Sequence, residues 1–187
     1  MSIWAWLHRQ QLATEIWEPV TIDHVHLAFF RSEFAKLPGR IVGDEDLAQH
    51  PDVSDPIQNR RRQTLLYGWR KPLLERIPAS TTWYEVRYLC EGHLHQLRII
   101  DFPDWNSPQD RNELLKVAGR KTIAMKDDPS QWSAPILWGH TRKGPFTIIE
   151  GNNRLIAYAS LTRRPPLRIA TYVGLSADPC CWHHPDR

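Results

Sequence analysis

The sequence predicts an α+β protein in which a small mixed sheet is flanked by helices and preceded by a helical extension. Two observations predict this class. From Thr82 onward, short β-branched and apolar runs alternate with helical patterns, the order expected when strands and helices pack in layers. Before that point, apolar residues recur at helical spacing between prolines. We therefore divide the chain into a helical extension over residues 1–80 and a second domain over residues 81–187.

The composition supports a globular protein and excludes several other classes. With 187 residues, of which 41% are hydrophobic and 24% charged, the chain is long enough to bury a core and is not disordered. No run approaches the roughly 18 apolar residues of a membrane span, and the first residues lack the pattern of a signal peptide. Three cysteines, two of them adjacent, do not form a disulfide framework. These features predict a cytoplasmic protein with no membrane partner.

The extension is expected to contain three helices. The first runs through Ile16, and the second covers residues 23–40 and ends at a Leu-Pro-Gly sequence. The third covers residues 57–78 and must kink at Pro72, because proline removes a helical hydrogen bond and clashes with the preceding turn. An exposed connection over residues 42–61 leads into this third helix.

The second domain is expected to begin with an antiparallel hairpin of residues 82–89 and 93–100, because alternating apolar residues flank a short glycine turn. A helix over residues 107–118 follows, with Ser107 as its cap and Pro108 in its first turn. The rest of the domain reads as strand, strand, helix and strand, over residues 134–140, 145–150, 152–164 and 166–175. This order predicts an α/β unit.

The joint between a strand and a helix at residues 150–154, Glu-Gly-Asn-Asn-Arg, is named here the hinge. Gly151 allows the chain to turn, and Asn152 or Asn153 can cap the new helix. Free backbone N–H groups and the helix dipole then favour an anion such as a phosphate, to which Arg154 can add a forked donor. Ordinary cap chemistry, with Arg154 paired to Glu150 or to a carbonyl group, explains the same residues, and both interpretations stay open here.

A loop just before the strand that leads into the hinge carries further candidate donors. Its sequence, Trp-Gly-His-Thr-Arg-Lys-Gly, supplies His140, Arg142 and Lys143. We expect the hairpin formed by the two strands around this loop to bring these residues near the hinge. Open α/β sheets place ligands beyond the carboxyl ends of their strands, so the donors would converge on one ligand.

Residues 134–175, with their strand, strand, Glu-Gly-x-x-Arg, helix and strand order, resemble the superfamily of ParB N-terminal domains, sulfiredoxins and free serine kinases. The likeness covers about residues 82–176. It implies a bacterial or phage protein whose hinge holds the phosphates of a nucleotide, with Arg154 paired to them and Glu150 beside them. The chain departs from that pattern at Asn152 and Asn153, where members carry charged residues, a histidine or a cysteine. The absence of a thiol from the hinge argues against sulfiredoxin chemistry.

The leading functional hypothesis is therefore a nucleotide-binding phosphotransferase or hydrolase. ATP or CTP would bind at Gly151, Asn152, Asn153 and Arg154, with Arg142 and Lys143 as further contacts. Mg²⁺ would be held through the phosphates and one carboxylate, because this cation keeps much of its water shell. Glu150 and His140 are the candidate catalytic residues, since positioned polar groups stabilise the charge that develops in phosphoryl transfer. No dedicated metal site of the protein itself is predicted.

Two alternatives use the same fold. The first is a non-catalytic module that binds a nucleotide, a nucleic acid or a protein, with the tryptophan- and arginine-rich extension, including Arg60–Arg62, as the partner surface. The second is a ParB-like nuclease, whose binding would weaken steeply with salt. The oligomeric state is open from the sequence. His24 and His26 alternate in Asp-His-Val-His-Leu and fit an ordinary helix or strand surface, and the Cys/His-rich segments 90–95 and 180–184 lack the usual zinc spacing.

Overall fold

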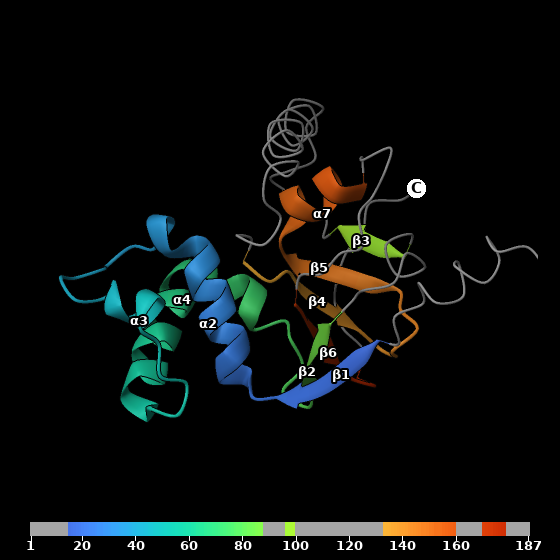
Figure 1. Cartoon of the computed structure of the whole chain (residues 1–187), viewed down its shortest axis with the longest axis horizontal. Coiled ribbons are helices and arrows are strands. Elements are labelled where there is room, and N and C mark those ends of the chain that lie inside the picture. Colours follow the sequence, from blue (N-terminus) through green and yellow to red (C-terminus); the bar gives the residue numbers. More distant parts are fainter. Residues whose placement is uncertain (1–14, 88–95, 100–132, 160–169, 179–187) are drawn as a thin grey trace, which may run out of the picture.

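The computed structural model describes residues 15–87, 96–99, 133–159 and 170–178 (Figure 1). Within these residues, six strands form one mixed sheet with the order β1-β2-β6-β4-β5-β3. The strands are β1 (Ile16–Val20), β2 (Thr82–Arg87), β3 (Leu97–Ile99), β4 (Ile136–Gly139), β5 (Phe146–Glu150) and β6 (Thr171–Leu175). Pairing is parallel between β4 and β6 and between β3 and β5, and antiparallel elsewhere. The predicted α+β class with a mixed sheet is confirmed at this level.

The described helices are α2 (Ile22–Glu33), the short 3-10 helix η1 (Phe34–Lys36), α3 (Asp46–Gln49), α4 (Pro56–Leu74) and α7 (Asn152–Ala159). The carboxylate of Asp55 caps α4 by accepting from the backbone N–H of Ile57 at 2.8 Å. Arg70 leaves the helical region, with φ of −119° and ψ of 20°, two residues before Pro72. The predicted kink is confirmed, and α3 lies inside the stretch predicted as a connection.

One hydrophobic core joins the helices of the extension to the sheet. Buried side chains from α2, α4 and three strands form this cluster, among them Phe29, Phe30, Leu66, Leu73, Trp83, Ile136 and Ile149. Burial of aromatic and aliphatic side chains on this scale is the main stabilising contribution in a domain of this size. The helices α2 and α4 therefore pack against the sheet and share its core.

The predicted helix through Ile16 is wrong where the structure describes it, because Ile16–Val20 forms β1. This strand lies at one end of the sheet and pairs antiparallel with β2. Trp17 meets the ring of Tyr84 edge to face, with centroids 5.7 Å apart. Pro19 is compatible with this position, since an edge strand leaves one side of its backbone without a ladder. Cross-strand contact outweighed the helical spacing, and residues 1–14 lie outside the described residues.

The predicted hairpin of residues 82–89 and 93–100 is also wrong. β2 pairs with β1 and β6, whereas β3 pairs in parallel with β5 at the opposite edge of the sheet. Trp83 and Val86 are both buried, as suits a strand with neighbours on both sides. A glycine between two alternating runs is a local signal and carries no information about these distant partners. The predicted helix over residues 107–118 lies outside the described residues.

Candidate functional site

The hinge has the predicted connection from strand to helix. β5 ends at Glu150, Gly151 adopts φ of +98°, and α7 begins at Asn152. A Cβ at position 151 would lie 3.1 Å from Cβ of Pro135, and side chains seldom adopt this φ. Glycine is therefore required both by the backbone conformation and by the close approach of Pro135.

Arg154 makes its hydrogen bonds inside the protein. It is 7% exposed, and its guanidinium donates to Oε1 of Glu150 at 2.8 Å. It also donates to both the carbonyl oxygen and the hydroxyl of Ser133. Burial lowers the pKa of Arg154, and the charge of Glu150 opposes that shift. The structural interpretation, in which Arg154 pairs with Glu150 and a carbonyl group, is the arrangement found here.

The two asparagines of the hinge do not cap α7. Their Oδ1 atoms are buried and have no hydrogen-bond partner among the described residues. Instead, the carbonyl of Gly151 accepts from the N–H groups of Arg154 and Leu155, at 3.0 and 2.9 Å. The predicted side-chain cap is therefore wrong. The amides of Asn152 and Asn153 keep unused hydrogen-bonding capacity at the helix start.

The structure does not bring the loop after β4 to the hinge. Gly139 pairs with Phe146 and Ile136 pairs with Glu150, so the loop lies at the first residue of β5 and the hinge follows the last. Five residues of strand separate the two ends by about 13 Å at the usual rise per residue. The expected convergence on one ligand is wrong, because the two ends of a strand cannot meet.

The three candidate residues of that loop lie in environments that are separate from the hinge. Nδ1 of His140 lies 2.9 Å from the carbonyl oxygen of Ser176. The guanidinium carbon of Arg142 lies 5.1 Å from the ring centroids of both Trp17 and Tyr84, a cation–π contact at the sheet edge. Lys143 is exposed. This loop therefore packs against β1, β2 and the end of β6.

The arginine cluster of the extension does not form a free basic patch. Arg62 is 0% exposed and donates to the carbonyl oxygen of Asp52 at 2.9 Å and to Oε1 of Gln58 at 3.0 Å. Arg61 forms an ion pair of 2.7 Å with Asp44. Two of the three cations thus hold the segment between α2 and α4 in place. Within the cluster Arg60–Arg62, two of the three charges are therefore engaged inside the protein.

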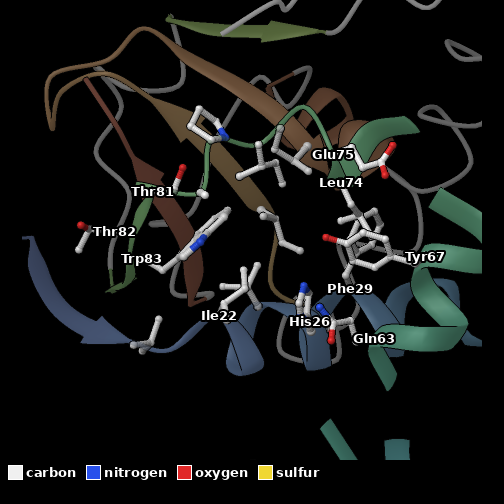
Figure 2. Close-up of a pocket in the computed structure, with 17 residues that line it drawn as sticks. Ile22, His26, Phe29, Gln63, Tyr67, Leu74, Glu75, Thr81, Thr82 and Trp83 are labelled. Carbon is white, nitrogen blue, oxygen red and sulfur yellow. The ribbon is translucent and has the colours of Figure 1, made fainter. Parts of the chain in front are cut away.

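A cavity of about 670 Å³ lies between α2, α4 and the sheet (Figure 2). No pattern in the sequence predicted this cavity. Its wall consists of Val20, Ile22, Val25, His26, Phe29, Gln63, Tyr67, Leu74, Glu75, Ile77, Pro78, Ala79, Thr81, Thr82, Trp83, Ile136 and Ile149. Small-molecule sites measure roughly 300 to 1,000 Å³ and are largely apolar with a few polar groups. The cavity meets both criteria.

The wall of the cavity is aromatic and nearly without charge. Phe29, Tyr67 and Trp83 contribute rings from α2, α4 and β2. Among the described residues that line it, Glu75 is the one carboxylate, and neither lysine nor arginine is present. The Glu75 side chain is 54% exposed and lies 3.6 Å from Lys71, so its charge belongs to the solvent side of the cavity. An anionic ligand would find no cation in this described part of the wall.

His26 is the described polar side chain of this wall that is both titratable and buried. It is 7% exposed, and its Nδ1 is buried without a hydrogen-bond partner among the described residues. Burial lowers the pKa of His26 and outweighs the opposite effect of Asp23, while Arg62 lowers it further. The ring is therefore neutral at pH 7. The prediction that His26 lies on an ordinary surface is wrong, and its place inside the apolar run Val25–Phe30 is the signal that could have indicated burial.

Comparisons of the chain with family models, with curated proteins and with solved structures returned no match. The resemblance to the ParB/sulfiredoxin-like superfamily therefore stays a prediction. Within the described residues there is no group of three histidine, cysteine or acidic side chains suited to a metal ion. The segments 90–95 and 180–184, with their cysteines and histidines, lie outside that part. None of the described helices is both long and apolar enough to cross a membrane.

Proposed function

We propose that the protein is a non-catalytic binding protein that holds a small, largely apolar molecule in the cavity between α2, α4 and the sheet. The observation that carries this proposal is the cavity itself, about 670 Å³ in volume and lined from both layers of the fold. The pairing of Glu150 with Arg154, and the distance of His140 from both, support binding without catalysis. This proposal shares the absence of catalysis with the predicted binding module, but that module was expected to bind a nucleotide, a nucleic acid or a protein.

The test is a fluorescence titration with N-phenyl-1-naphthylamine, a neutral apolar probe that brightens when it leaves water. Two variants reduce the cavity from different sides, Val25→Phe from α2 and Ala79→Trp from the chain between α4 and β2. Val42→Phe is the matched control, because Val42 is fully exposed and does not line the cavity. We expect saturable binding by the natural protein and by the control, with an affinity at least fivefold weaker in both cavity variants. Equal binding by two folded cavity variants would overturn the proposal.

A second candidate is a nucleoside triphosphate, ATP or CTP with Mg²⁺, at the hinge. The observation that favours it is the turn at Gly151 directly before the first residue of α7, where the first backbone N–H groups of the helix lie. The unpaired Oδ1 atoms of Asn152 and Asn153 are acceptors, so they would pair with a hydroxyl or amino group of the nucleotide and not with its phosphates. The first N–H groups of a helix lack intrahelical acceptors and attract phosphates. Phosphoryl transfer or hydrolysis at the hinge would also require Glu150 to separate from Arg154. For this second candidate we therefore propose binding of the nucleotide alone. The nuclease alternative gains no support from the described residues.

Thermal shift with ATP and CTP, each with and without Mg²⁺, tests this second candidate. A ligand at about 100 times its dissociation constant adds about 2.7 kcal/mol to the free energy of unfolding. Asn152→Asp keeps the side-chain shape and places a negative charge where the phosphates would lie, so it should abolish the shift. Lys143→Ala should leave the shift unchanged, since Lys143 is at the other end of β5. A shift that survives Asn152→Asp in the folded protein would exclude the hinge.

A further inference from the structure

Glu75 is a carboxylate of the cavity that a bound ligand can reach. It lines the cavity, yet its side chain is 54% exposed. It lies beside Leu74 at the edge of the lining residues, on the same side of the cavity as Tyr67 (Figure 2). A charged group of a ligand can meet Glu75 at this edge and keep part of its water, so it avoids the cost of full burial.

The partner that Glu75 has in the protein holds it loosely. Nζ of Lys71 lies 3.6 Å from Oε1 of Glu75, beyond the usual range of a hydrogen bond, and the lysine side chain is 63% exposed. By comparison, Asp44, Glu33 and Glu150 accept from arginines at 2.7, 2.9 and 2.8 Å. An ion pair between two exposed side chains contributes little to stability, so a cation carried by a ligand replaces Lys71 at small cost.

The described wall around Glu75 also favours a positive charge over a negative one. Neither lysine nor arginine is among the described lining residues, so an anion would meet Glu75 with no cation of the wall to offset the repulsion. The hydroxyl end of Tyr67 points toward the middle of the cavity (Figure 2). A phenol oxygen accepts from an ammonium N–H, and an aromatic ring face attracts a cation. A positive end of the ligand therefore belongs near Glu75 and Tyr67, and its apolar body near Phe29 and Trp83.

We infer that the ligand of this cavity is an apolar amine, whose protonated amino group pairs with Glu75 at the edge while its apolar body fills the cavity. The inference rests on the binding function proposed above. An ammonium group has donors and no acceptor, which suits a carboxylate and a phenol oxygen. A neutral compound of the same shape would bury the same apolar surface and leave Glu75 with Lys71, so the amino group distinguishes the two ligands.

Displacement of N-phenyl-1-naphthylamine by three naphthalene compounds tests the charge requirement. At pH 7 and low salt, 2-naphthylmethylamine is a cation, 2-naphthylmethanol is neutral and 2-naphthylacetate is an anion, all on the same rings. We expect the affinity to fall in that order. Glu75→Gln keeps the shape of the side chain and should reduce the preference for the amine over the alcohol about threefold, a change within the range of exposed ion pairs. Glu75→Lys should reverse the order of the amine and the acetate.

Two further measurements separate the pair from general effects on the cavity. Glu45→Gln is the matched control, because Glu45 is exposed and does not line the cavity, and it should leave the preference unchanged. Lys71→Met removes the competing cation, so affinity for the amine should rise about twofold while affinity for the alcohol stays the same. In the natural protein, salt at about 1 M should screen the pair and remove most of the preference.

Two results would overturn the inference and leave the cavity in place. One is a preference for the amine that is unchanged in Glu75→Gln and Glu75→Lys, and the other is equal or stronger binding of the alcohol by the natural protein. Saturable binding of N-phenyl-1-naphthylamine would still support the cavity in both cases. Failure of this probe and of all three compounds to bind the natural protein would overturn the proposed function as well.

Discussion

The hinge and the cavity differ in what surrounds their buried polar groups. At the hinge, Arg154 is buried and finds its partners in Glu150 and Ser133, while the buried Oδ1 atoms of Asn152 and Asn153 have none among the described residues. In the cavity, His26 is equally buried and its Nδ1 likewise lacks a partner there, but the wall around the cavity is largely apolar and encloses about 670 Å³. An ion pair that is satisfied within the protein stabilises the fold, whereas an apolar space between two layers can accept a ligand. The hinge is the more conspicuous motif in the sequence, yet its Arg154–Glu150 pair stabilises the fold and is not free to bind a ligand.

The largest effect should come from breaking the hinge pair. Arg154→Met leaves a largely buried Glu150 carboxylate and the Ser133 carbonyl without their donor. Loss of one member of a buried pair costs about 3 to 5 kcal/mol, so we expect a loss of about 3 kcal/mol in urea denaturation. Lys143→Met, on the exposed loop, should change stability by less than about 0.5 kcal/mol. If the two variants unfold alike, Arg154 is not structural and is free for a ligand.

The next effect is the dependence of stability on pH through His26. Its pKa in the folded protein is below the ordinary value of 6.5 for a histidine, so the unfolded chain takes up a proton first as the pH falls. Stability should decrease below pH 6.5, with a slope approaching about 1.4 kcal/mol per pH unit until His26 itself protonates. Asp23 and Arg62 act on this ring in opposite directions, and Glu75 lines the same cavity. His26→Phe should lose this component, and an identical pH profile would contradict the neutral buried ring.

Titration of the carboxylates should change stability in a lower pH range than titration of His26. Burial opposes ionisation of Glu33, but hydrogen bonds from Trp69 and Arg70, with the charges of Arg70 and Lys36, lower its pKa below the ordinary value of 4.5 for a glutamate. Its contribution to stability is therefore present above about pH 4.5 and is lost as the pH falls through the lowered pKa. Denaturation curves at pH 5 to 7 thus isolate His26 from these groups.

Removal of the unpaired nitrogen should stabilise the empty protein. In His26→Phe a ring of similar size remains, and the buried Nδ1 that lacks a partner is gone. We expect the free energy of unfolding at pH 7 to rise by about 1 kcal/mol, the lower end of the cost of an unsatisfied buried group. His26→Phe should therefore raise the free energy of unfolding, whereas Arg154→Met should lower it. This difference in sign tests the comparison between cavity and hinge most sharply. Destabilisation by more than 1 kcal/mol would show that Nδ1 is already satisfied.

The smallest effect concerns the loop after β4. Arg142→Ala removes a cation that lies over the rings of Trp17 and Tyr84. Exposed contacts of this kind contribute about 0.5 to 1 kcal/mol, so a small loss of stability is expected in thermal denaturation. Any thermal shift caused by ATP should stay unchanged, because the loop lies at the far end of β5 from the hinge. A weaker nucleotide shift would restore the predicted convergence of loop and hinge.

The sequence predicted those features that depend on neighbouring residues. The strand, glycine and helix of the hinge follow from local backbone preferences, and the kink before Pro72 follows from the chemistry of proline. The partners of each strand do not follow from local patterns, which is why β1 and β3 were misplaced. The cavity was beyond prediction for the same reason, since α2, α4 and β2 meet there only through the tertiary fold. The paired state of Arg154 was one of two interpretations that residue types alone allow.

The most direct test of the account is an amide NMR titration of the natural protein with N-phenyl-1-naphthylamine and, separately, with ATP and Mg²⁺. The probe should move the resonances of cavity residues such as Val25, Tyr67 and the Trp83 indole, and should leave Gly151 and Asn153 of the hinge unchanged. Saturable changes at these cavity positions would establish the cavity as the binding site. Changes confined to the hinge, with either compound, and a silent cavity would contradict the central claim and return the function to the hinge.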